Sequence, residues 1–196
     1  MAAERDAVPD GRAARYEFRV WGKHRKARRA LARLADEETS ETVDDCYLLV
    51  DDPTWNAKVR DDTLKLKHLV AEDRGFERWS SQHHRSSSTT PTPFDEIFEA
   101  LRLDRPQRGK SFDITKAVKR LDGSDVRAVF VVKRRRRFRV GELRAEATDI
   151  ELTDSGEVLH TLSIEGDDLD ALRALRKQLG LRDEPNVAVH QAIDSA

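Results

Sequence analysis

The sequence has 196 residues and a mass of 22.4 kDa, which is the size of one ordinary domain. Charged residues make up 37% of it, against about 25% in a typical soluble domain, yet 36 basic residues balance 37 acidic ones. This balance excludes a uniformly basic nucleic-acid coat and a uniformly acidic tail. The single cysteine, Cys46, excludes an internal disulfide, and no apolar run has membrane-spanning length, so we expect a cytoplasmic protein.

The first part of the chain predicts one helix among several strands. Residues 1–13 lack periodicity and predict a flexible terminus, so a single domain is expected over residues 14–196. Apolar and charged residues alternate over residues 14–20, as in a strand, whereas residues 22–37 have helical spacing. Three more strands are predicted over residues 43–51, 55–60 and 63–70.

The middle of the chain predicts a loop and two short helices. Residues 80–93 (SSQHHRSSSTTPTP) are rich in Ser, Thr and Pro, which is typical of a mobile loop. The two helices after it are expected from the apolar sets Phe94, Ile97, Phe98, Leu101 and Ile114, Ala117, Val118, Leu121.

Strands return in the last part of the chain, over residues 127–140, 142–152 and 157–165. Over residues 142–152 the apolar side chains change from odd to even positions after Glu146, which predicts a β-bulge. A helix is expected from about Asp167 to Gly180, and a short helix near the C-terminus. This order predicts an α+β protein whose antiparallel strands close into a barrel, with helices packed on the outside.

The polar faces of the predicted strands carry mostly one type of charge. The residues concerned are Lys58 and Arg60, then Lys65 and Lys67, and then Lys133, Arg135, Arg137 and Arg139. Because the helices need the apolar strand faces, these charged faces should point toward one another inside the barrel. Facing cations repel unless an anion lies between them, so the pattern predicts a polyphosphate ligand. Nearby carboxylates would hold Mg²⁺ or Mn²⁺.

These features together resemble the CYTH family, the triphosphate tunnel metalloenzymes. The stretch RYEFR, residues 15–19, is similar to the opening Glu-x-Glu-x-Lys signature, with Arg15 in place of the first Glu. Asp45-Cys46-Tyr47 resembles the Asp-x-Tyr landmark, and residues 133–138 resemble the Lys-x-Arg-x-x-Tyr strand. Residues 161–165 are similar to the final acidic strand, with Thr161 and Ser163 replacing two of its three acids.

The resemblance implies an eight-stranded antiparallel tunnel that hydrolyses an inorganic or organic triphosphate with Mg²⁺ or Mn²⁺. It implies phosphate-binding roles for Arg19, Lys58, Arg60, Lys65, Lys67, Lys133, Arg135 and Arg137. Glu17 and Glu165 would be the catalytic acids. The metal would be bound by Glu17, Glu165 and one of Glu146, Asp149 or Glu151.

Two other interpretations stay open. The lost acids are also compatible with an impaired tunnel that binds polyphosphate or a nucleotide without hydrolysing it. Alternatively, the basic run 133–139 belongs to a nucleic-acid-binding module, with Arg134 and Arg136 facing outward. The tunnel is favoured over the nucleic-acid-binding module, because three predicted strands each carry their basic residues on one face.

Overall fold

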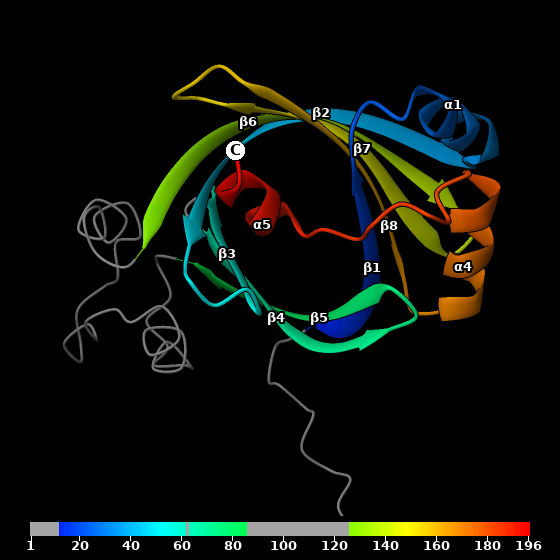
Figure 1. Ribbon diagram of the computed structural model, residues 1–196, viewed down its shortest axis with the longest axis horizontal. Coiled ribbons are helices and arrows are strands. Elements are labelled where there is room, and N and C mark those ends of the chain that lie inside the picture. The colour runs from blue at the N-terminus through cyan, green and yellow to red at the C-terminus, as the bar shows by residue number, and fades with distance from the viewer. Residues whose placement is uncertain (1–11, 62, 86–125) are drawn as a thin grey trace, which may run out of the picture.

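The computed structural model describes residues 12–61, 63–85 and 126–196, and these form a closed antiparallel barrel of eight strands (Figure 1). The order around the barrel is β1-β5-β4-β3-β2-β6-β7-β8, and β1 closes the ring by pairing with β8. The strands are β1 (Arg12–Trp21), β2 (Glu37–Leu49), β3 (Trp55–Arg60), β4 (Thr63–Asp73), β5 (Phe76–Arg85), β6 (Arg127–Val140), β7 (Leu143–Leu152) and β8 (Val158–Gly166). The predicted fold class is confirmed.

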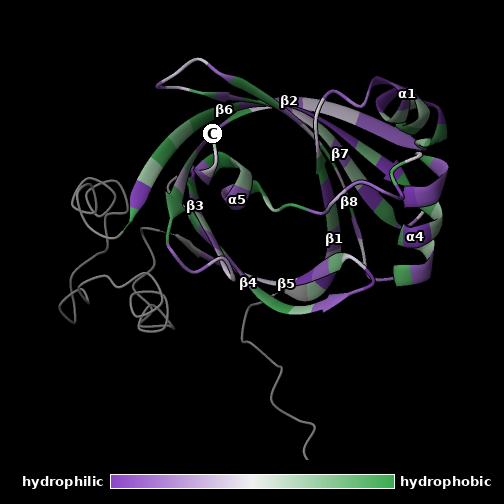
Figure 2. Ribbon diagram, in the orientation of Figure 1, coloured by the Kyte–Doolittle hydropathy of each residue, from purple (hydrophilic) through white to green (hydrophobic). Residues whose placement is uncertain are grey.

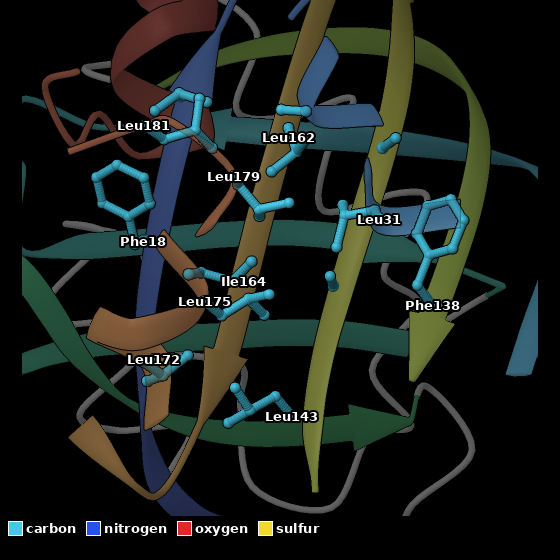
Figure 3. Packing of buried hydrophobic residues seen from close by; sticks show 14 of the residues in the cluster. Phe18, Leu31, Phe138, Leu143, Leu162, Ile164, Leu172, Leu175, Leu179 and Leu181 are labelled. Atoms are coloured by element: carbon cyan, nitrogen blue, oxygen red, sulfur yellow. The ribbon is translucent and has the colours of Figure 1, made fainter. Parts of the chain in front are cut away.

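Two helices, α1 (Arg25–Leu34) and α4 (Leu169–Gln178), pack against the outside of the barrel (Figure 1). The Asp168 side chain caps α4 by accepting hydrogen bonds from two backbone amides of its first turn. Gly180, whose φ of 71° suits glycine, follows the end of this helix. The core beneath the two helices contains outward residues of β1, β6, β7 and β8, and Figure 3 shows how Leu31, Leu172 and Leu175 pack against it.

The short helix α5 (Val189–Asp194) corrects the expectation that all helices lie outside. It lies within the ring of strands in Figure 1, where Val189 and Ile193 are buried against Ile150 and Leu152 of β7. The apolar side chains of this cluster therefore fill one end of the barrel. No helix among the described residues is long and apolar enough to cross a membrane.

The expected bulge in β7 is absent, because this strand pairs with β6 and β8 without a register shift. Its even-numbered residues face the interior along the whole strand. The apparent change of parity has a different cause: Ile150 and Leu152 point inward to the apolar end that α5 fills, whereas Glu146 points inward to the polar end.

The predicted loop over residues 80–93 starts too early, because residues 80–85 continue β5. This segment has few β-forming residues, but β4 pairs along all of it and β1 pairs with Ser81, and that pairing outweighs its weak propensity. At the N-terminus, β1 already begins at Arg12, inside the expected terminus 1–13. The rest of the loop and both helices predicted around Phe94 and Ile114 lie outside the described residues.

Candidate functional site

The inward strand faces enclose a cavity of about 480 Å³, to which all eight strands contribute. Figure 2 shows hydrophilic and hydrophobic residues alternating along the strands, as expected when one face is covered and the other lines a polar interior. Nine basic side chains line the cavity: Arg19, Lys58, Lys65, Lys67, Lys133, Arg135, Arg137, Arg139 and Arg144. Four carboxylates of the described residues line it, those of Glu17, Glu37, Glu146 and Glu165. The cavity therefore has a strongly positive lining.

At the deep end of the cavity, three cations surround one aspartate. The Asp45 side chain is completely buried. Arg60 contacts it with two nitrogens, at 2.5 and 2.7 Å, and Lys58 donates to it at 2.9 Å. The Lys133 ammonium lies 3.3 Å from the same carboxylate and also donates to the Tyr47 hydroxyl. One negative charge thus faces three positive ones.

The pKa values in this cluster reflect the excess of positive charge. Burial, together with the nearby Arg19 and Arg135, lowers the pKa of Lys133 to about 8. Burial and the charge of Lys133 lower the pKa of Lys58 well below its usual range. Burial alone would raise the pKa of Asp45, but the adjacent cations outweigh burial and hold it well below its usual value. An additional anion would stabilise the charged forms of both lysines.

A second cluster forms around Glu17 on β1. Its two carboxylate oxygens accept from Arg19 at 3.0 Å and from Lys67 at 2.7 Å. Burial favours the protonated acid, but these two cations prevail and lower the pKa of Glu17 to about 2. Glu165 lies directly opposite Glu17 in the pairing of β1 with β8. Its nearest basic partner is Arg144, at 3.6 Å, and about a third of its side chain is exposed.

Glu146 on β7 forms a third cluster. Arg135 donates to one of its oxygens through two nitrogens, and the Thr148 hydroxyl donates to the other at 2.6 Å. Arg135 also contacts Glu41, at 2.5 Å, and Glu41 in turn pairs with Arg137 at 2.5 Å. Burial opposes ionisation of Glu146, yet Arg135 lowers the pKa of this carboxyl well below its usual value.

Lys65 differs from the other cavity lysines, because it forms no hydrogen bond or ion pair with any residue that the structure describes. It lies beside Lys58 in the pairing of β3 with β4. Burial and the charge of Arg60 lower its pKa. Lys65 is therefore available to bind a ligand without first breaking an ion pair.

Most of the predicted site residues meet in this cavity, but Arg60, Asp149 and Glu151 do not line it. Glu151 has an odd position on β7, like Asp149, and pairs with Arg134 at 2.8 Å. Arg60 lies behind the lining and holds Asp45. Asp149 faces the outside of the barrel, where it pairs with Arg28 at 3.0 Å and with His160 at 2.9 Å. The reason is its odd parity on β7, which places it on the opposite face from Glu146. Asp149 therefore does not join the cavity carboxylates.

Three important residues received no role from the sequence. Asp45 and Tyr47 were noticed only as a landmark, and Glu41 was not considered. All three are odd-numbered residues of β2, the parity that faces inward in this strand. The same alternation that identified the basic residues would have identified them.

The two arginines expected to face outward, Arg134 and Arg136, lie on the outside of β6. They are paired with carboxylates, Arg134 with Glu151 and Arg136 with Glu38, each at 2.8 Å. Since the alternate residues of the basic run line the cavity, this strand does not present a continuous basic surface to a nucleic acid.

A metal site built from the protein alone is not formed. Among residues 12–61, 63–85 and 126–196, no three His, Cys, Asp or Glu side chains are grouped closely enough to hold a metal ion. Mg²⁺, however, is commonly bound by one or two carboxylates together with the phosphates of a substrate. Glu17 and Glu165, adjacent on β1 and β8, fit this shared type of site.

Comparison with solved structures gives matches over nearly the whole chain. No protein-family model matches the sequence, and a search of curated proteins found no match. A candidate adenylate cyclase from Bacillus halodurans is 11% identical with a TM-score of 0.54, covering 93% of this chain and 98% of its own. The PH1012 protein from Pyrococcus horikoshii OT3 is 13% identical with a TM-score of 0.52, covering 90% and 98%. A conserved hypothetical protein from Pyrococcus furiosus is 13% identical with a TM-score of 0.52, covering 90% and 99%.

At such low identity these matches establish the architecture alone. They agree with the resemblance found in the sequence, because the closed barrel has eight antiparallel strands and a positive interior. The chain therefore shares the fold of these proteins, and its closed barrel of eight antiparallel strands is the architecture that the resemblance to the CYTH family implies.

Proposed function

We propose that the tunnel binds the triphosphate group of an inorganic or organic compound and hydrolyses it. The observation that supports this most strongly is the lining itself, in which nine basic side chains face four carboxylates. Holding like charges together in a partly buried space is unfavourable unless an anion compensates them. A triphosphate is a compact anion whose many oxygens suit both the fork of Arg and the point charge of Lys.

The ion pairs in the tunnel would exchange partners when the ligand binds. Glu17 holds Arg19 and Lys67, and Glu146 holds Arg135, in positions from which they can turn to a phosphate. Phosphate oxygens would replace these carboxylates as acceptors, while Lys65 would bind directly. Because the cations are already positioned, little reorganisation is needed to stabilise charge in the transition state.

The carboxylates displaced from their basic partners would then be free for a divalent cation that enters with the triphosphate. Glu17 and Glu165 would hold Mg²⁺ or Mn²⁺ together with the phosphates. Glu146 lies close to this pair, because it is paired with Ser163, the inward residue of β8 next to Glu165. When bound, the metal would neutralise charge on the phosphate oxygens. Asp149 is excluded from this set by its outward position.

Hydrolysis requires water to attack the terminal phosphorus while the bond to the bridging oxygen breaks. Glu165 is the carboxylate that we assign to accept a hydrogen bond from that water, since it lies opposite Glu17 in the pairing of β1 with β8, is partly exposed and is only loosely paired. Lys and Arg side chains would stabilise the charge that develops on the leaving phosphate oxygen. The proton of the attacking water would pass to Glu165 and then to solvent.

Binding without hydrolysis is the second candidate function. It is favoured by the absence, among the described residues, of a group of three carboxylates suited to a metal, and by the basic partners of Glu17 and Glu146. In that case the same cations would hold a polyphosphate or a nucleotide as a bound ligand.

A screen for phosphate release tests both candidates. Tripolyphosphate and nucleoside triphosphates are incubated with the protein and Mg²⁺ or Mn²⁺, and thermal shifts are recorded in parallel. ATP is included and its products are checked for a cyclic nucleotide, because one protein of this fold is described as a candidate adenylate cyclase. Release supports hydrolysis, and a thermal shift without release supports binding alone. Neither release nor a shift would contradict both.

Lys65→Ala is expected to weaken tripolyphosphate binding about tenfold, the effect of losing roughly 1.4 kcal/mol of charge-assisted interaction. The fold should be unaffected, because Lys65 makes no ion pair with a described residue. Isothermal titration calorimetry measures the change. Lys26→Ala on the exposed face of α1 removes the same charge far from the tunnel and serves as the matched control. An equal loss in both variants would mean that only net charge matters.

Anion affinity is expected to fall as the pH rises through about 8, because the pKa of Lys133 is lowered to about 8 and its charge is then lost. Titrations with tripolyphosphate between about pH 7 and about pH 9 measure this fall. In Lys133→Arg the guanidinium remains charged, so the dependence should be flatter. An identical pH dependence in the two proteins would show that Lys133 does not contact the anion.

A further inference from the structure

A second positively charged cavity lies on the outside of the barrel, away from the tunnel. It has a volume of about 460 Å³ and lies where the β4–β5 turn, α4 and the residues after α4 meet. Its lining consists of Arg74, Arg173, Ala174, Arg176, Lys177 and Arg182. Five of these six residues are basic and none is acidic. We call this cavity the outer pocket.

The sheet separates the outer pocket from the tunnel. The Arg176 guanidinium stacks on the ring of Phe18, with its central carbon 3.9 Å from the ring centre. Phe18 belongs to the outward face of β1, whereas Glu17 and Arg19 on either side of it face the tunnel. The two groups of cations therefore cannot share one ligand.

Arg176 is held in a fixed position by uncharged groups. Besides the Phe18 ring, it contacts three backbone carbonyls, donating to those of Leu181 at 3.1 Å, Arg182 at 2.8 Å and Glu184 at 2.9 Å. Its remaining nitrogen, Nη1, has no hydrogen bond to the described residues and points to Gly75, where a Cβ would come within 3.2 Å. Burial lowers the pKa of Arg176, and the charge of Asp183 opposes this shift without outweighing it.

Arg74, which lines this pocket, has a positive φ that is unfavourable for arginine. Its φ is 53° and that of Gly75 is 77°, the pair of positive angles that a tight hairpin turn requires. Asn or Asp is preferred at the first position of such a turn, and Arg is disfavoured there. A strained residue retained against this preference is often a functional one.

The acidic groups near the outer pocket are weakly held. Arg74 and Arg173 share the carboxylate of Asp170 at 3.4 and 3.3 Å, and the Asp170 side chain is 81% exposed. Asp73 lies 3.6 Å from Arg74 and is also largely exposed. Exposed pairs of this kind contribute little, so an anion with several oxygens could displace them.

We infer that the outer pocket is a second anion site that binds phosphate or a short polyphosphate between the β4–β5 turn and α4. The arginine forks and Lys177 supply donors for phosphate oxygens. Among the described residues, the lining has one apolar member, Ala174, and no aromatic side chain that could stack on a nucleobase. Recognition therefore rests on the phosphate groups.

Calorimetric titration with pyrophosphate tests this inference through the number of classes of sites. The wild type should show two classes, one from the tunnel and one from the outer pocket. Lys177→Ala combined with Arg182→Ala should weaken one class about tenfold or more and leave the other unchanged, since each lost contact is charge-assisted. Lys65→Ala should affect the other class. Since the tunnel is tested by its own variant, failure of one site is distinguishable from failure of the other.

The matched control is Lys26→Ala combined with Arg29→Ala, which removes two exposed charges from α1. It should leave both classes of sites unchanged. A single class of sites in the wild type, or an equal loss in the control and the pocket variant, would overturn the inference.

Arg74→Asn separates the binding role of this residue from its effect on the turn. Without anion its melting temperature should rise, because Asn suits the positive φ better than Arg. Pyrophosphate should then raise the melting temperature of this variant less than it raises that of the wild type, because the outer pocket binds the anion more weakly. A lower melting temperature together with unchanged pyrophosphate binding would contradict the inference.

Discussion

Replacing Glu165 with glutamine is expected to lower the rate of triphosphate hydrolysis by about 100-fold or more, the usual contribution of a general base. The substitution keeps the size of the side chain but removes the charge that accepts a proton from water. Binding of tripolyphosphate in the absence of metal should remain, because the phosphate contacts come from the basic side chains of the tunnel. Phosphate release from tripolyphosphate at saturating concentration measures the rate, and the melting temperature reports whether the protein is still folded.

Glu37→Gln is the matched control for this variant. Glu37 also lines the tunnel and also pairs loosely with an arginine, Arg139 at 3.4 Å, but it lies on β2 and is 68% exposed. Its substitution should change the rate less than about threefold, because strands β6 and β7 separate it from Glu165 and Glu17. Similar losses in both variants would show that the total charge of the tunnel, and not Glu165, determines the rate.

Asp45→Asn is expected to give the largest loss of stability, about 3–5 kcal/mol, the cost of leaving buried charges without their partner. Arg60 would keep its charge without the carboxylate that compensates it, and the pKa values of Lys58 and Lys133, which Asp45 raises, would fall further. Denaturant unfolding measures the free energy of unfolding. Glu38→Gln, which breaks the exposed pair with Arg136, should cost about 1 kcal/mol or less.

Two further measurements test whether the missing negative charge causes the loss of stability in Asp45→Asn. Tripolyphosphate should stabilise the Asp45→Asn protein more than the wild type, because it supplies the missing negative charge. Acid should destabilise the wild type more than the variant. The pKa of Asp45 is lowered on folding, so its contribution is present above the ordinary value of 3.8 and is lost as the pH falls below it. Equal stabilisation of both proteins by the anion would contradict this account of the cluster.

The parity of charge along the seven predicted strands was enough to predict a basic barrel interior and most of its lining, whereas β5 was not predicted as a strand. Lys58, Lys65, Lys133 and Arg135 were identified in this way, and the structure places all of them in the tunnel. This succeeds because successive side chains of a strand point to opposite faces, so a face carrying only cations is visible in the sequence. The helices bury the apolar face of the strands on the outside of the barrel, so the basic face points inward.

What the sequence did not predict depends on contacts between distant segments. Residues 80–85 have no apolar alternation, and they form a strand only because β4 pairs along all of them and β1 pairs with Ser81. Ile150 and Leu152 were interpreted as a change of face, because nothing local indicates that α5 would fill one end of the barrel. The resemblance to an acidic strand named Asp149 beside Glu146 without fixing the register, and the regular pairing of β7 with β6 places Asp149 on the outer face.

The position of α5 has a kinetic consequence for any reaction in the tunnel. Because Val189 and Ile193 close one end with apolar side chains, within the described residues a ligand reaches Asp45 and its cations only from the opposite mouth. The products of hydrolysis would have to leave by the route through which the next triphosphate arrives. The phosphate nearest the deep end would then be released last. Pyrophosphate or phosphate should therefore compete directly with the substrate for the tunnel. At high product concentration, the rate of product release would limit turnover.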